Sequence, residues 1–273
     1  MGFCHRFTDH PTAGVRVTTM SRPLPPEILD LVIDQLHDKP TTLKACCLVS
    51  KSCISRTRRH LFAYVGFDLS TFESWMKVFP DLSNSPAHHT HSLSIRELSK
   101  ILISTPAGMD MGRWIRAFYN VVHFVFDLDI NYSVKGRYDD HIASFLGFSP
   151  TVRSLRVTST SSKVFDFVCS FPLLEDLALI NIYSERDTVR RRRTPSTSPK
   201  FTGSLYLSAR GGICSSARRL LDLPDGLRFT KITVWCNGRD FGSVTDLVSG
   251  CSNTLVSLTV HCFELGAFPS GSL

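Results

Sequence analysis

Apolar residues near the start of the chain follow a helical spacing. Between Pro25 and Pro40 they wrap most of the circumference of one predicted helix: Ile28, Leu29, Leu31, Val32, Ile33 and Leu36. The two prolines set the limits of this helix, and Thr41 or Thr42 is the predicted cap of the next one. A helix that is apolar nearly all round is normally buried on more than one side, and so small a helical unit has little interior. Its second side must be covered by the rest of the chain or by another protein, and the pattern favours another protein.

A different pattern begins near residue 64. Residues 64–69 alternate as a short strand, and residues 71–79 carry apolar side chains at helical spacing. Beyond them, a triplet of apolar, any and apolar residue recurs as a predicted strand every 22 to 31 residues, starting at Leu93, Phe124, Leu155, Leu177, Leu205, Ile232 and Leu258. Amphipathic stretches lie between these strands, at residues 139–146, 163–169, 217–221 and 243–248.

Alternating short strands and helices are the layout of a leucine-rich-repeat solenoid, in which stacked neighbours bury the apolar face that no unit buries alone. The spacing is irregular, and the Asn that usually follows each strand is mostly missing, although Asn181 lies near one such place. We therefore predict an α+β or α/β solenoid: a small all-helical unit at residues 21–63, then irregular leucine-rich-repeat-like units over residues 64–268. No polar cap follows the last predicted strand, so we expect an exposed C-terminal repeat. A conventional α/β domain with a parallel sheet is the alternative.

Two segments of the helical unit carry a recognisable motif. Leu24-Pro25-x-Glu27-Ile28-Leu29 is followed about twenty residues later by a helix with Cys46 and Leu48-Val49-Ser50-Lys51. This arrangement resembles the F-box motif, with Cys53 at a position where that family commonly has Trp. A helical hairpin inside a larger helical domain is the alternative. The order of helical unit and irregular repeats also resembles the expanded fungal F-box families.

The resemblance implies that the chain is the substrate-recognition subunit of a Skp–cullin–F-box E3 ubiquitin ligase. The helical unit would bind the Skp-type adaptor, and through it a cullin–RING ligase, while the repeats would bind an unknown target protein. The implied adaptor-binding residues are Leu24, Pro25, Pro26, Glu27, Ile28, Leu29, Ile33, Leu36, Leu43, Cys46, Leu48, Val49 and Ser50. A leucine-rich-repeat-like interaction scaffold that does not assemble a ligase is the alternative.

The strand positions outside the predicted core are candidates for target binding. In leucine-rich solenoids such positions tend to face the concave side. Here they include Arg156, Ala178, Tyr206, Thr233 and Thr259, of which all but Ala178 are candidate target contacts. The set is chemically mixed and does not indicate a particular ligand.

Cysteine content and hydropathy bear on the compartment. The nine cysteines are odd in number, none forms a Cys-x-x-Cys pair, and most lie in apolar segments. This pattern indicates free thiols in a reducing compartment, so we expect a cytoplasmic or nuclear protein. No apolar run is long enough to span a bilayer, and we expect no membrane partner. Residues 1–20 lack periodicity, which predicts a disordered lead or reflects the choice of start codon.

The net charge of +7 is concentrated in one segment. Residues 185–203 form a predicted basic loop that contains Arg190, Arg191, Arg192 and Arg193. A solvated insertion explains this loop, and a nuclear-import signal or a patch for acidic or phosphorylated partners are the sharper hypotheses. A single basic loop does not make a nucleic-acid-binding domain, and we expect no nucleic-acid partner.

Catalytic signatures are missing from the sequence. It contains no glycine-rich nucleotide loop, nucleophile elbow or zinc-protease motif. His88, His89 and His91 predict an exposed histidine-rich turn in preference to a metal site. Asp127, Asp129, Asp139 and Asp140 fit helix capping and solvation. We therefore expect a non-catalytic protein without a cofactor or metal.

Overall fold

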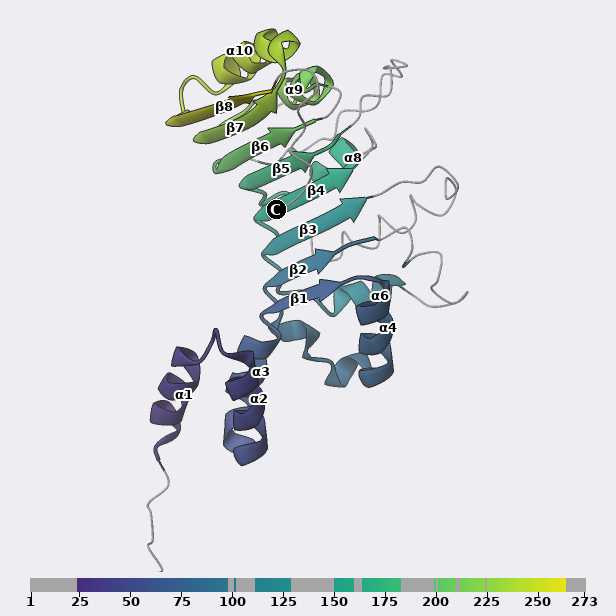
Figure 1. Ribbon diagram of the computed structural model, residues 1–273, viewed down its shortest axis with the longest axis vertical. Helices are drawn as coiled ribbons and strands as arrows, with labels where there is room; N and C mark the ends of the chain where they lie inside the picture. The colour runs from purple at the N-terminus through teal and green to yellow at the C-terminus, as the bar shows by residue number, and fades with distance from the viewer. Residues whose placement is uncertain are drawn as a thin grey trace, which may run out of the picture.

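The protein combines a helical unit with a large parallel sheet, as the computed structural model in Figure 1 shows. The structure describes residues 24–97, 101, 111–128, 150–159, 164–182, 199, 201–209, 212–223 and 225–263. The chain belongs to the mixed α/β class, which confirms the broad fold class predicted from the hydrophobic pattern. Residues 1–23, 139–146, the arginines at 190–193 and residues after 263 lie outside the described part.

Three short helices form the N-terminal unit: α1 (Pro26–Gln35), α2 (Pro40–Val49) and α3 (Lys51–Leu61). Their shared core consists of Ile33, Leu43 and Cys53, with Leu36 and Leu61 packed against it. The prediction of a threonine cap for α2 is wrong, because α2 begins at Pro40 and its N-cap residue, Lys39, makes no side-chain cap. Proline suits the first helical position, where its fixed φ is already helical and its missing N–H is not needed.

Eight strands follow, and all neighbouring pairs are parallel: β1 (Tyr64–Phe67), β2 (Ser92–Ile95), β3 (His123–Leu128), β4 (Ser154–Ser159), β5 (Asp176–Ile180), β6 (Ser204–Ser208), β7 (Lys231–Cys236) and β8 (Ser257–Cys262). Their order in the sheet is the order in the chain. Each of the seven predicted triplets lies inside one of β2 to β8, and residues 64–67 of the predicted first strand form β1.

The register places the apolar positions of all strands in two continuous rows. One row runs from Val65 to Leu258, and the other runs from Phe67 to Val260. Except at the edge strand β8, these residues are buried. Because side chains alternate along a strand, the positions between them lie on the opposite face.

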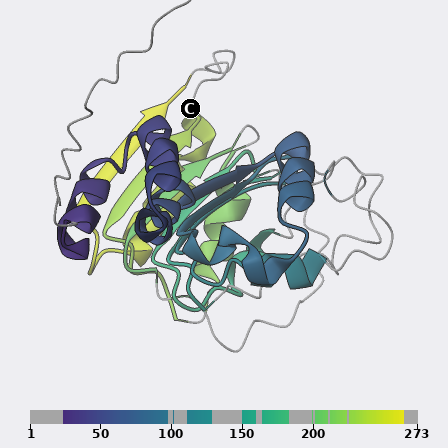
Figure 2. The same ribbon diagram turned by 90° about the horizontal axis from the view of Figure 1, so that it is seen from below.

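The helices that follow β1 pack on the core face of the sheet (Figures 1 and 2). Among the described residues they are α4 (Leu69–Val78), α6 (Met111–Arg116), α8 (Val164–Val168), α9 (Cys214–Leu221) and α10 (Phe241–Gly250). The 3-10 turns η1 (Leu82–Asn84) and η2 (Pro86–His89) lie between α4 and β2, and η5 (Gly238–Asp240) precedes α10. Helices α4, α8, α9 and α10 confirm four of the predicted amphipathic segments.

An aromatic cluster joins the start of the sheet to its first helices. The ring of Phe67 on β1 packs edge-on against four other rings, with centroid distances of 5.1 to 5.9 Å. Its partners are Phe72, Trp75, Trp114 and Phe118. Edge-to-face contacts of this kind are favourable beyond the area that they bury, so Phe67 anchors the β1 end of the core.

Candidate functional site

An ion-pair hub fixes the orientation of α1 on α3. The Arg56 guanidinium donates to both carboxylate oxygens of Asp34, with Nε 2.6 Å from Oδ1, and His60 Nε2 lies 2.7 Å from the same Oδ1. The hydrogen bonds from Arg56, followed by those from His60, hold the pKa of the Asp34 carboxyl well below its usual range. Because Asp34 lies on α1 and both partners lie on α3, the hub presents one fixed side of α1 to the interior.

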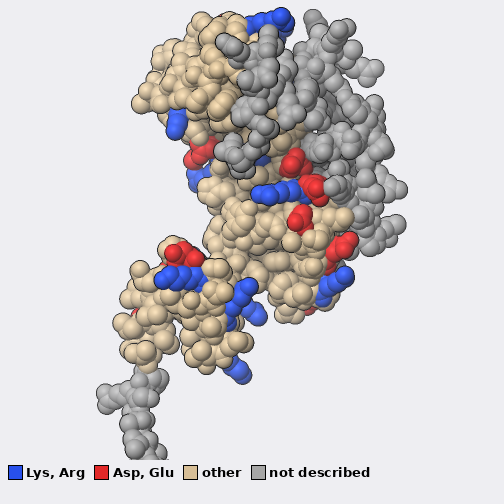
Figure 3. All heavy atoms as spheres, in the orientation of Figure 1, with Lys and Arg blue, Asp and Glu red and all other residues tan. Residues whose placement is uncertain are grey.

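The other side of α1 is exposed. Its apolar residues Leu31 and Val32 are 60% and 52% exposed, and Leu48 and Val49 at the end of α2 are 89% and 83% exposed. Leu24 and Ile28 belong to the same set. Mostly uncharged side chains cover this part of the molecule in Figure 3. No other described segment covers these residues. Ile28, Leu31 and Val32 share one side of α1 by their helical spacing, and contiguous exposed apolar groups mark protein-interaction surfaces. We call the six residues the apolar helical surface.

The structure divides the thirteen predicted adaptor-binding residues into three groups by their burial. Ile33 and Leu43 are buried at 3% and 1% exposure, so they stabilise the helical unit and cannot contact an adaptor directly. Leu29, Leu36, Cys46 and Ser50 are half-buried, and the remaining seven are exposed: Leu24, Pro25, Pro26, Glu27, Ile28, Leu48 and Val49. Leu31 and Val32 are outside the predicted set, although both are exposed on α1. The sequence already indicated an exposed apolar side on α1, because its apolar residues cover two faces and only one of them can pack on α3.

Cys53 lies inside the helical unit. Its side chain is buried against the core of Ile33 and Leu43, and its carbonyl accepts a hydrogen bond of 2.6 Å from the Thr57 hydroxyl. The position where the F-box family commonly has Trp is therefore a packing position in this chain.

The predicted target-contact residues lie in one row across the sheet. Register pairs join Arg156 to Ala178, Ala178 to Tyr206, Tyr206 to Thr233, and Thr233 to Thr259. The row lies on the face opposite the core, as the alternation predicts. Along the next row, the rings of Trp235 and His261 stack with centroids 4.2 Å apart. This face combines a cation, hydroxyls and aromatic rings, a mixture suited to protein recognition.

The structure describes only some of the remaining candidate residues. His88 and His91 are exposed and His89 is half-buried, around the turn η2. No group of three or more His, Cys, Asp or Glu side chains is arranged to hold a metal ion among the described residues. Of the four predicted capping aspartates, only Asp127 is described, and it lies on β3. Within the described part, no helix is both long and apolar enough to cross a membrane.

Comparison of the chain with protein-family models, with curated proteins and with solved structures finds no match in any of the three. The apolar helical surface and the open face of the sheet are therefore the two features that indicate a function.

The Asp34 hub predicts an acid-sensitive helical unit. The carboxyl pKa is lower in the folded protein than its ordinary value of 3.8, so ionised Asp34 stabilises the fold above that pH. This stabilisation is lost as the pH falls below about 4, when the unfolded chain takes up the proton first. We expect Asp34→Asn to speed hydrogen–deuterium exchange in α1 at pH 7, and the difference from the native protein to shrink in acid.

Asp38→Asn is the matched control for this prediction, because Asp38 is exposed in the turn after α1. It should leave the exchange of α1 unchanged. Equal exchange in Asp34→Asn and the native protein at pH 7 would show that the hub does not hold α1 in place.

Proposed function

We propose that this chain is the substrate-recognition subunit of a Skp–cullin–F-box ubiquitin ligase, with the helical unit as its F-box. The observation that carries the proposal is the apolar helical surface, which the described remainder of the chain leaves uncovered. Its exposed Leu24 and Ile28 lie in the Leu-Pro-x-Glu-Ile-Leu segment that resembles the F-box motif. Burial of these side chains against an adaptor would supply the apolar contact that α1 lacks within its own unit.

The sheet supports the second half of the proposal, a target-binding domain of leucine-rich-repeat type. Strand order equals chain order throughout, and the helices pack on one face of the sheet. Stacked strand–helix repeats produce this arrangement, whereas a doubly wound α/β domain reverses its strand order. The row from Arg156 to Thr259 would then face the target. The sequential order thus favours the repeat interpretation over a conventional α/β domain.

In this role the chain catalyses no reaction itself. It holds the target and the adaptor at the same time, and so raises the effective concentration of the target near a ubiquitin-charged enzyme. The ring of Phe62 at the end of α3, which packs edge-on against Trp75 of α4 at 5.7 Å, and the contact of α3 with η2 connect the two parts. A firm connection of this kind would fix the distance between target and adaptor.

Binding to a purified Skp-type adaptor tests the proposal. We expect the full chain and the adaptor to elute as one complex in size-exclusion chromatography and to give a saturable signal in titration calorimetry. A folded chain that does not bind the adaptor would reject the ligase role. That result would leave the alternative of an interaction scaffold, for which the open sheet face is the supporting observation.

A further inference from the structure

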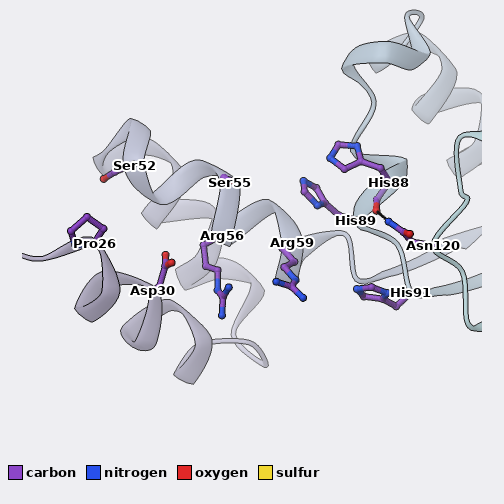
Figure 4. A pocket seen from close by; sticks show the side chains of 10 residues that line it. All are labelled: Pro26, Asp30, Ser52, Ser55, Arg56, Arg59, His88, His89, His91 and Asn120. Carbon is purple, nitrogen blue, oxygen red and sulfur yellow. Dashed lines mark hydrogen bonds between the residues drawn. The ribbon is translucent and has the colours of Figure 1, made fainter.

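A polar cavity of about 510 Å³ lies between the helical unit and the start of the sheet. Its lining comes from α1, α3, the turn η2 and the segments before β2 and β3: Pro26, Asp30, Ser52, Ser55, Arg56, Arg59, His88, His89, His91 and Asn120. We call it the junction cavity. Its volume falls within the range of about 300–1,000 Å³ that is common for small-ligand pockets. Figure 4 shows Arg59 between the other residues of the helical unit and the three histidines.

Several polar groups of the cavity already have partners. Arg56 is bound by Asp34, the Asn120 amide donates to the carbonyl oxygen of His88 at 2.7 Å, and His88 Nδ1 lies 3.1 Å from the Ser85 carbonyl oxygen. Arg59 makes no ion pair within the described residues. The Arg59 guanidinium and the remaining imidazole nitrogens are therefore donors without a described acceptor.

The histidines decide the net charge of the cavity. When they are neutral, the two negative charges of Asp34 and Asp30 balance the two positive charges of Arg56 and Arg59. When they are protonated, three positive charges are added to the same lining. The rings of His88 and His89 have centroids only 3.9 Å apart, so two charged imidazoles would repel each other strongly unless an anion lay beside them.

The surroundings of His89 disfavour the protonated form of its ring. Partial burial lowers the pKa of His89, and the nearby cations His88, Arg58, Arg59 and His91 lower it further. A group in such a position is protonated readily only when an anion offsets its neighbours. The carboxylate of Asp30 is part of the lining but leaves the net charge positive in the protonated state.

We propose that the junction cavity binds a phosphate group, with the Arg59 guanidinium and the side chains of the three histidines as its main donors. Charge-assisted hydrogen bonds from guanidinium and imidazolium to phosphate oxygens are short and strong. The Ser55 hydroxyl adds a neutral donor at the same cavity, whereas the Ser52 hydroxyl lies 2.8 Å from that of Ser50 and already has a partner. Because the cavity touches both the helical unit and the turns beside the sheet, a bound phosphate would tighten the connection between them. The site does not depend on adaptor binding.

Sulfate is the first probe, because it stays doubly charged between pH 6 and 8 and any pH dependence then reports on the protein. We expect calorimetric titration with sodium sulfate to give at least tenfold tighter binding at pH 6 than at pH 8. The next probes are inorganic phosphate and a short phosphoserine peptide. The second pKa of the phosphoserine group is about 6. A clear preference for the peptide identifies a phosphorylated protein as the source of the group, and equal affinity identifies free phosphate.

Arg59→Gln and His89→Gln should each weaken binding of sulfate and phosphate about tenfold or more, the usual cost of losing one charge-assisted hydrogen bond. Lys77→Gln is the matched control, because it removes one exposed positive charge from α4 outside the cavity. Circular dichroism checks the fold of each variant. Absence of sulfate and phosphate binding at pH 6, or equal affinity in Arg59→Gln, His89→Gln and the native protein, would overturn the proposal. Adaptor binding, measured on the same variants, should not change, so the two proposals fail separately.

Discussion

Replacing Leu31 and Val32 together with Asp is expected to abolish binding of a Skp-type adaptor, with an affinity loss of at least about a hundredfold. The two side chains are the centre of the exposed side of α1 and make no core contact. In a complex, each carboxylate would be forced into an apolar interface without a partner, which costs several kcal/mol for a buried unpaired charge. In the free chain both positions face solvent, so the helical unit should fold normally.

Titration calorimetry with the purified adaptor measures this effect, and thermal unfolding checks the fold. Leu24→Ala with Pro25→Ala is a milder test of the same surface and should also abolish the complex without unfolding the sheet. Val78→Asp is the matched control, because Val78 is 66% exposed on α4, away from the helical unit. If the Leu31 and Val32 variant bound as tightly as the native protein, the exposed side of α1 would have no part in adaptor recognition.

Phe67→Ala is expected to lower the free energy of unfolding by about 3–5 kcal/mol, the usual cost of removing a fully packed aromatic ring. Phe67 is only 2% exposed, and its ring contacts two aromatic rings of α4, one of α6 and the ring of Phe118 just after α6. Its loss would leave a cavity between the first strand and two helices that cannot close without moving the sheet. A whole domain is typically stable by only about 5–15 kcal/mol, so this one change is severe.

Urea unfolding followed by tryptophan fluorescence is the natural measurement, because Trp75 and Trp114 lie beside the missing ring. Tyr64→Ala is the control on the same strand, since Tyr64 is exposed on the opposite face. It should change the stability by less than about 1 kcal/mol. If Phe67→Ala and Tyr64→Ala were equally stable, the aromatic cluster would not be the anchor of the sheet.

The elements of this protein could be predicted well from local pattern. Each apolar triplet became a strand because a period of two with β-branched and large apolar residues suits a strand buried on one face. Helices α4, α8, α9 and α10 followed from their 3.6-residue period, whereas α6 was not predicted. The predicted threonine cap of α2 is wrong because two helix-start signals occupy adjacent positions, and Pro40 begins the helix itself.

The Asp34 hub and the junction cavity could not be predicted from the sequence, because each is formed by residues that are distant in sequence. Asp34, Arg56 and His60 are unremarkable as separate residues and form a hub only because α1 packs on α3. Arg59 and the three histidines are about thirty residues apart and share a cavity because α3 contacts η2. No periodicity in a single segment carries this information.

The sequence by itself determined that α1 has more apolar surface than one neighbour can cover, because six apolar side chains wrap nearly the whole helix. It also determined which strand positions alternate between the two faces of the sheet. Only the tertiary structure decided which side of α1 stays open. Packing on α3 buries Ile33 and draws Asp34 into the hub, which leaves Leu31 and Val32 in solvent. Burial depends on the partner that each face meets, and that partner is set by the fold of the whole chain.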